Sequence, residues 1–88
     1  MILKVEEFRC NNVIIAPKNH YEVDINFNEH GMYEINDKSL QINILHSDHS
    51  KLIDWYYYEL RKLWISALNN VPHAKSRMYK YFHSINGE

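Results

Sequence analysis

The chain contains few of the residues that break regular structure or cross-link a fold: 88 residues include two glycines, two prolines and one cysteine. Because Cys10 stands alone, a disulfide within the chain is excluded, and a lone thiol is typical of a reducing compartment. Loops that hold phosphate groups need clustered glycines, whereas Gly31 and Gly87 lie far apart. These absences point away from a disulfide-stabilised secreted domain and from a nucleotide-binding loop.

Long apolar runs and a strong net charge are absent too. No apolar stretch approaches the length of a membrane span. Lys4, Glu6 and Glu7 interrupt the first eight residues, so we expect no signal peptide. The formal net charge is −1, and 45% hydrophobic with 24% charged residues is typical of a globular protein. We therefore expect a small cytoplasmic domain that does not enter a membrane.

Residues 1–46 show the alternation of apolar and polar side chains that indicates β-strands. It is clearest from Tyr21 to Asn28, where Tyr21, Val23, Ile25 and Phe27 are predicted to face a core. Alternation resumes at 33–36 and 40–44, after short turns at 29–31 and 37–39. With shorter candidate strands at 1–9 and 13–16, this pattern predicts an antiparallel β-meander of four to five strands.

Residues 48–70 read as one long amphipathic helix. Ser47, Asp48 and Ser50 are candidate N-caps, and Asn69-Asn70 followed by Pro72 predicts its end. At ~100° per residue, one broad apolar face follows from the spacing. That face comprises Ile53, Tyr56, Tyr57, Leu60, Leu63, Trp64, Ala67, Leu68 and Val71. We expect this helix to cover the sheet, with Leu60 and Trp64 as its least replaceable residues.

A shorter helix is predicted over residues 72–85, with Pro72 at its first position and Gly87 capping its end. The predicted fold is therefore a single α+β domain over residues 1–88: a β-meander, a long helix packed on one of its faces, and a short C-terminal helix.

The long helix also bears a second, narrower stripe on its opposite side. We call Trp55, Tyr58, Lys62 and Ile65 the outer stripe. A helix that covers one sheet needs only one apolar face, so either the C-terminal segment or a partner is expected to cover this second one. Exposed Trp and Tyr are the residue types that dominate protein interfaces. The preferred interpretation is a protein-binding surface that also supports a homodimer.

The outward side chains of the predicted sheet give a second candidate surface for a protein partner. Glu22, Asp24 and Glu34 make this face acidic, which suits docking to a basic partner. Residues read from A/T-rich codons (Asn, Ile, Lys, Tyr and Phe) make up 37 of the 88. An A/T-rich gene of this size is compatible with a phage- or mobile-element-encoded inhibitor of a host enzyme.

Nucleic-acid binding is the alternative. Residues 51–88 carry six Lys or Arg against three Asp or Glu, whereas residues 1–50 carry four against eight. Cations neutralise phosphates and aromatic rings stack on unpaired bases. The candidate residues are Arg61, Lys62, Lys75, Arg77, Tyr79 and Lys80. Against this alternative stands the overall charge of −1, since dedicated nucleic-acid modules are usually strongly basic.

The sequence offers little for catalysis, and we expect neither an enzyme nor a cofactor. Cys10 with His20 as its base is weaker than an inert thiol in a turn. Glu22 and Asp24 fall on the solvent face, where nothing would raise their pKa. His46, Asp48 and His49 cluster at the strand-to-helix junction and are weak metal candidates, because their spacing matches no zinc signature.

Overall fold

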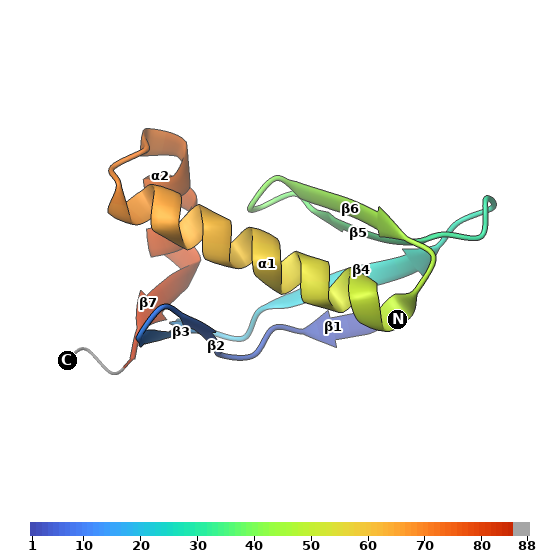
Figure 1. Cartoon of the computed structure of the whole chain (residues 1–88), viewed down its shortest axis with the longest axis horizontal. Coiled ribbons are helices and arrows are strands. Elements are labelled where there is room, and N and C mark those ends of the chain that lie inside the picture. Colours follow the sequence, from blue (N-terminus) through green and yellow to red (C-terminus); the bar gives the residue numbers. More distant parts are fainter. Residues whose placement is uncertain (86–88) are drawn as a thin grey trace.

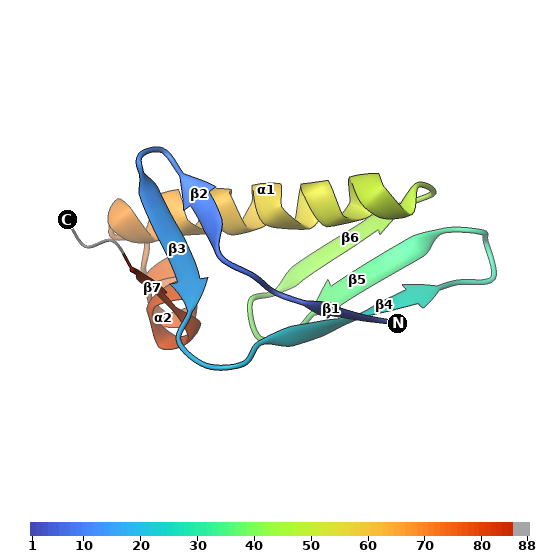
Figure 2. The same cartoon turned by 90° about the horizontal axis from the view of Figure 1, so that it is seen from below.

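The computed structural model describes residues 1–85 and has an α+β architecture of two antiparallel sheets and two helices. The first sheet has strand order β1-β4-β5-β6 and the second β2-β3-β7. Figure 2 shows α1 running along both sheets, with the second sheet near the end of α1 that leads into α2. The element bounds are β1 (Ile2–Lys4), β2 (Phe8–Cys10), β3 (Val13–Pro17), β4 (Glu22–Phe27), β5 (Tyr33–Asp37), β6 (Ile42–His46), α1 (His49–Leu68), α2 (Pro72–Tyr81) and β7 (Phe82–Ser84).

The predicted meander is confirmed for β4, β5 and β6, which pair in chain order. Ile25 lies opposite Ile35 in β5, and Ile35 also lies opposite Ile44 in β6, so these side chains share one face. All three are buried, as are Val23 and Ile42. Gly31 in the β4–β5 turn has φ +76°, which explains a glycine there.

The stretch predicted as one strand over residues 1–9 is two strands in two different sheets. Leu3 and Val5 face the core, and after Glu6-Glu7 the inward positions are Phe8 and Cys10. The inward-facing positions thus change from odd to even numbers, which marks the point where the chain leaves the first sheet at β1 and enters the second at β2. At the crossing the Glu6 N–H donates to the Tyr57 hydroxyl, 3.0 Å away.

The C-terminal helix is shorter than predicted. It ends at Tyr81, and Phe82–Ser84 form β7, which pairs with β3. β3 thereby has a neighbour on each side, β2 and β7. Phe82 is buried against Phe8 and Tyr21, so its apolar side chain fits a strand as well as a helix. The predicted cap at Gly87 lies outside the described residues.

The long helix begins and ends as predicted. Asp48 is its N-cap and accepts hydrogen bonds from the backbone N–H groups of Ser50 and Lys51. Asn69 follows the last turn, and Asn70 has φ +65°. The inward face differs in two respects, because Leu52 is buried but was not predicted to be, while Leu68 and Val71 are exposed.

The inward face of α1 packs against both sheets and α2 (Figure 1). Its buried residues are Leu52, Tyr56, Leu60, Trp64 and Ala67. One flank is tied to β2, since the Arg61 Nε donates to the Arg9 carbonyl at 2.8 Å and the Phe8 and Tyr57 rings lie 5.9 Å apart. Phe27 was predicted to face this core but is 63% exposed, at the end of β4, where its ring packs 4.8 Å from Tyr33.

Leu60→Ala should lower the free energy of unfolding by about 2–5 kcal/mol, because the side chain is fully buried and its loss leaves a cavity. Leu68→Ala makes the same truncation on the same helix at an exposed position and should cost less than about 0.5 kcal/mol. Urea denaturation of both variants measures the difference. Equal losses would show that α1 does not pack on the sheets through this face.

Candidate functional site

The outer stripe lies on the surface of the folded chain. Trp55 and Tyr58 are 54% and 58% exposed, and Ile65 is 40% exposed. Helical geometry explains this exposure, because α1 turns the side chains of Leu52, Tyr56, Leu60 and Trp64 toward the sheets and thus the outer stripe toward solvent. Within residues 1–85, the C-terminal segment does not cover the stripe: α2 packs elsewhere, with the Tyr79 ring 5.4 Å from that of Trp64.

Polar side chains border the aromatic part of the stripe. The Lys62 ammonium lies 5.2 Å from the centre of the Tyr58 ring and 3.3 Å from the Glu59 carboxylate. Trp55, Tyr58 and Glu59 line an open depression of about 420 Å³. An apolar depression with charged groups at its border is the usual anatomy of a protein-binding surface.

The acidic surface predicted from Glu22, Asp24 and Glu34 lies on the other side of the molecule. These residues alternate with Val23, Ile25 and Ile35, which face α1, so they point away from α1. Glu22 pairs with His20 at 2.6 Å, and the Asn43 amide donates to Glu34 at 3.4 Å. The structure therefore does not bring the acidic surface and the outer stripe together, and they are separate candidates.

The residues of the nucleic-acid alternative do not form one continuous face. On α2, Lys75, Arg77 and Lys80 point in directions spread over about half of the helix circumference. On α1, the Arg61 side chain reaches toward Arg9 and β2, while Lys62 belongs to the outer stripe. The Tyr79 ring packs edge-to-face against the Trp64 ring, so one side of it is not available to stack on a base. A groove that binds the phosphate backbone of a nucleic acid needs such cations along one line, and these residues do not provide it.

The three weak metal candidates are engaged separately. The His46 Nδ1 accepts a hydrogen bond from the Asp48 N–H at 2.9 Å, and the His49 Nε2 lies 2.9 Å from the Met1 sulfur. Hydrogen bonds from Ser50 and from the Lys51 N–H hold the pKa of the Asp48 carboxyl below its usual range as it caps α1. Among residues 1–85, no group of three His, Cys, Asp or Glu side chains is placed to hold a metal ion.

Cys10 is buried, and this burial raises the pKa of its thiol. A raised pKa lowers the thiolate fraction that a nucleophile needs. The sulfur lies 3.9 Å from the Arg61 carbonyl oxygen, whereas His20 is paired with Glu22.

A buried carboxylate between two tyrosines is the feature that the sequence did not reveal. Asp37 is 3% exposed, at the end of β5. The Tyr56 hydroxyl donates to it at 2.6 Å, the Tyr21 hydroxyl at 2.9 Å and the Leu40 N–H at 3.1 Å. Burial first, and then Asp37 itself, raise the pKa of both tyrosines far above the ordinary range, so their hydroxyls remain donors.

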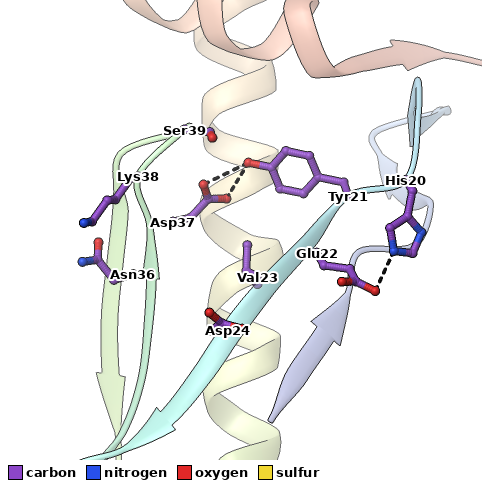
Figure 3. A pocket seen from close by; sticks show the side chains of 9 residues that line it. All are labelled: His20, Tyr21, Glu22, Val23, Asp24, Asn36, Asp37, Lys38 and Ser39. Atoms are coloured by element: carbon purple, nitrogen blue, oxygen red, sulfur yellow. Dashed lines mark hydrogen bonds and ion pairs between the residues drawn. The ribbon is translucent and has the colours of Figure 1, made fainter.

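Tyr21 and Asp37 of this cluster line an open pocket of about 430 Å³ between β4 and β5 (Figure 3). The two strands pair at Ile25–Phe27, whereas Glu22 to Asp24 pair with β1 and are separated from β5 by a gap. Figure 3 shows the Tyr21 side chain reaching across this gap to Asp37. Asp37 thus joins β5 to α1 and to Tyr21, the residue just before β4. No sequence spacing links residues 21, 37 and 56, and Asp37 was predicted only to begin a turn.

Comparison of the chain with protein-family models, with curated proteins and with solved structures finds no match. Within the described residues, neither helix is long and apolar enough to cross a membrane.

Raising the pH above about 10 should destabilise the fold through Tyr56. Because its pKa is higher in the folded chain, the unfolded chain releases this proton first, so stability that is complete below pH ~10 is lost as the pH rises further. The free energy of unfolding should fall by up to about 1.4 kcal/mol per pH unit from Tyr56. Urea denaturation from about pH 8 to pH 11 measures this slope.

Tyr56→Phe should reduce the slope, and Tyr21, whose pKa is raised in the same direction, should account for part of what remains. Tyr58→Phe removes an exposed hydroxyl from the same helix and is the matched control, which should leave the slope unchanged. Equal slopes for the wild type and Tyr56→Phe would contradict a Tyr56 hydroxyl held by Asp37.

Proposed function

We propose that this chain acts by binding another protein through the outer stripe of α1, without catalysing a reaction. The observation that carries the proposal is the exposure of Trp55 and Tyr58 on a helix whose opposite face is already buried. Large apolar side chains that remain in solvent after folding contribute favourable burial free energy only when a partner covers them.

The residue types support a protein as the partner. Trp and Tyr supply a large contact area with few rotatable bonds, and truncating such anchors commonly costs about 2 kcal/mol or more of binding free energy. Glu59 and Lys62 beside them provide a polar border. The acidic surface of Glu22, Asp24 and Glu34 remains available to a second, basic contact on the other side of the sheet.

An inhibitor encoded by a phage or mobile element and directed at a host enzyme is the setting that we propose for this binding. The length of 88 residues and the many residues that are read from A/T-rich codons fit that setting. Nucleic-acid binding is the weaker alternative, because the chain spreads its cations over two helices and has a net charge of −1.

Changing Trp55→Ala together with Tyr58→Ala should leave the fold intact and reduce partner capture from a native extract by at least about tenfold. Circular dichroism and urea denaturation report the fold, and capture is repeated after nuclease treatment. The matched control is Phe27→Ala with Leu68→Ala, which removes an exposed aromatic and an exposed aliphatic side chain elsewhere. Unfolding of the Trp55/Tyr58 variant, or unchanged capture, would contradict the proposal.

Retention on a phosphate-bearing resin separates the nucleic-acid alternative. A protein-binding surface predicts weak retention that changes little when Lys75, Arg77 and Lys80 are reversed to Glu. A steep salt dependence that these reversals abolish, with capture lost after nuclease treatment, would instead favour nucleic acid.

A further inference from the structure

The first sheet ends in a free edge at β6. The strand order β1-β4-β5-β6 gives β6 one neighbour, β5, and within residues 1–85 no strand pairs with its other side (Figure 1). The charges, prolines and bulges that usually protect an edge strand are absent from Ile42–His46. A strand in this position presents a row of unpaired backbone N–H and C=O groups, which another extended segment can pair with residue by residue.

The flank of α1 beside this edge carries an apolar depression. The Trp55 ring lies 5.2 Å from the ring of His46, the last residue of β6. The other flank of α1 is tied to β2 through Arg61, so Trp55 projects on the side of β6. Trp55 also lines the depression of about 420 Å³ together with Tyr58 and Glu59. Because Trp55 takes part in both contacts, the depression adjoins the free edge.

A carboxylate borders the same edge on the outer face of the sheet. Glu34 of β5 lies opposite Leu45 of β6, and β5 and β6 themselves contain no Lys or Arg. The Asn43 amide donates to Glu34 at 3.4 Å without neutralising its charge. Strands lie about 4.8 Å apart, so a residue added beside Leu45 would lie roughly 10 Å from Glu34. A Lys or Arg side chain covers that distance, with its methylene groups over the exposed Leu45 side chain.

The position of α1 limits which strands this edge accepts. α1 packs against β6 more than against any other strand, so it lies over the strand that forms the edge. A second copy paired through its own β6 would bring a second α1 over the neighbouring strand, about 4.8 Å away, whereas helices pack with their axes about 8–10 Å apart. An extended segment without a helix on that face meets no such obstacle.

We propose that the free edge of β6 binds an extended segment of the partner protein as an added strand. Successive side chains of a strand point to opposite faces. Apolar side chains of the segment therefore contact Trp55 on the side of α1, and a Lys or Arg between them reaches Glu34 on the other side. The inference rests on the proposed function, since it describes the segment that the partner presents to the outer stripe.

A library of random dodecapeptides, displayed on phage and selected on the immobilised wild-type chain, supplies the probe. Enriched peptides should carry apolar residues at every second position, with Lys or Arg between them. Apolar residues at three- and four-residue spacing would indicate a helical ligand and would overturn the added strand. A selection that enriches no peptide would overturn it as well.

N-methylation of the most strongly enriched peptide tests the backbone pairing. A paired strand directs every second N–H toward its neighbour, so methylating that series should raise the Kd at least about tenfold. Methylation of the intervening N–H groups is the matched control and should leave the Kd within about threefold. Fluorescence anisotropy of the labelled peptide measures each Kd. Equal effects of the two series would contradict binding as a strand.

Two charge reversals locate the segment at β6. Glu34→Lys should raise the Kd of the peptide about three- to tenfold, because an attraction becomes a repulsion. Asp24→Lys makes the same change in charge on β4 and is the matched control. Three strand spacings, about 14 Å, separate β4 from the added segment, which exceeds the screening length of about 8 Å at physiological salt. Its Kd should therefore stay within about twofold of wild type.

Circular dichroism reports the fold of both variants, and Glu34→Gln with Asp24→Asn as its control replaces them if either does not fold. Equal Kd values for the Glu34 and Asp24 variants would overturn binding beside Leu45. A peptide whose Kd is unchanged by Trp55→Ala would overturn the contact with α1.

Failure of this inference is distinguishable from failure of the proposed function. If no peptide is enriched but an extract still yields a protein captured through Trp55 and Tyr58, the added strand is overturned and the proposed function stands. Sedimentation equilibrium of the wild type covers the remaining occupant. A chain that dimerises and enriches no peptide would make a second copy, docked by another route, the molecule that covers the outer stripe.

Discussion

Leu52, Tyr56, Leu60 and Trp64 bury one face of α1 against two separate sheets and α2, and this contact holds the described structure together. The sheets are small, with three and four strands, and neither has a second helix layer large enough to cover it. At about 1.5–3 kcal/mol for each large buried side chain before entropy, the shared face of α1 supplies much of the stabilisation. Asp37 adds a polar tie between β5 and α1 through Tyr56.

A helix used in this way has one free side, and the outer stripe occupies it. The acidic residues lie on the far face of the sheet, so the molecule presents two chemically different surfaces in opposite directions. A flat partner can contact one of these surfaces at a time. The stripe carries two exposed aromatic rings and Ile65 beside Lys62. The outer face of the sheet carries three carboxylates, with only the aliphatic side chains of Ile2 and Leu45 exposed beside them. This difference is why we assign the principal contact to α1.

The parts of the fold with strong periodicity were predictable from sequence. The alternation around Val23 and Ile25 identified β4, and the spacing from Tyr56 to Trp64 identified α1 and, by its opposite side, the exposed Trp55. The misassigned parts depend on distant pairing. Phe82 leaves α2 because β3 offers an open edge, and Phe27 lies at a strand end where its ring packs on Tyr33.

The change of sheet between β1 and β2 had a readable signal, the shift of inward positions across Glu6-Glu7. The Asp37 cluster had none, because its three members come from separate elements and share no motif. The free edge of β6 also follows from strand order, which short-range patterns do not specify. Local periodicity thus predicts elements and their faces, while neighbours in space decide edges and buried polar groups.

The most direct test of a helix with one buried and one free face compares the indole rings of its two tryptophans. At a concentration where the chain is monomeric, acrylamide should quench the fluorescence of the Trp64→Phe variant strongly, because the remaining Trp55 is 54% exposed, and that of the Trp55→Phe variant weakly, because the remaining Trp64 is 6% exposed. Equal quenching of the two variants, both folded, would contradict a free outer face.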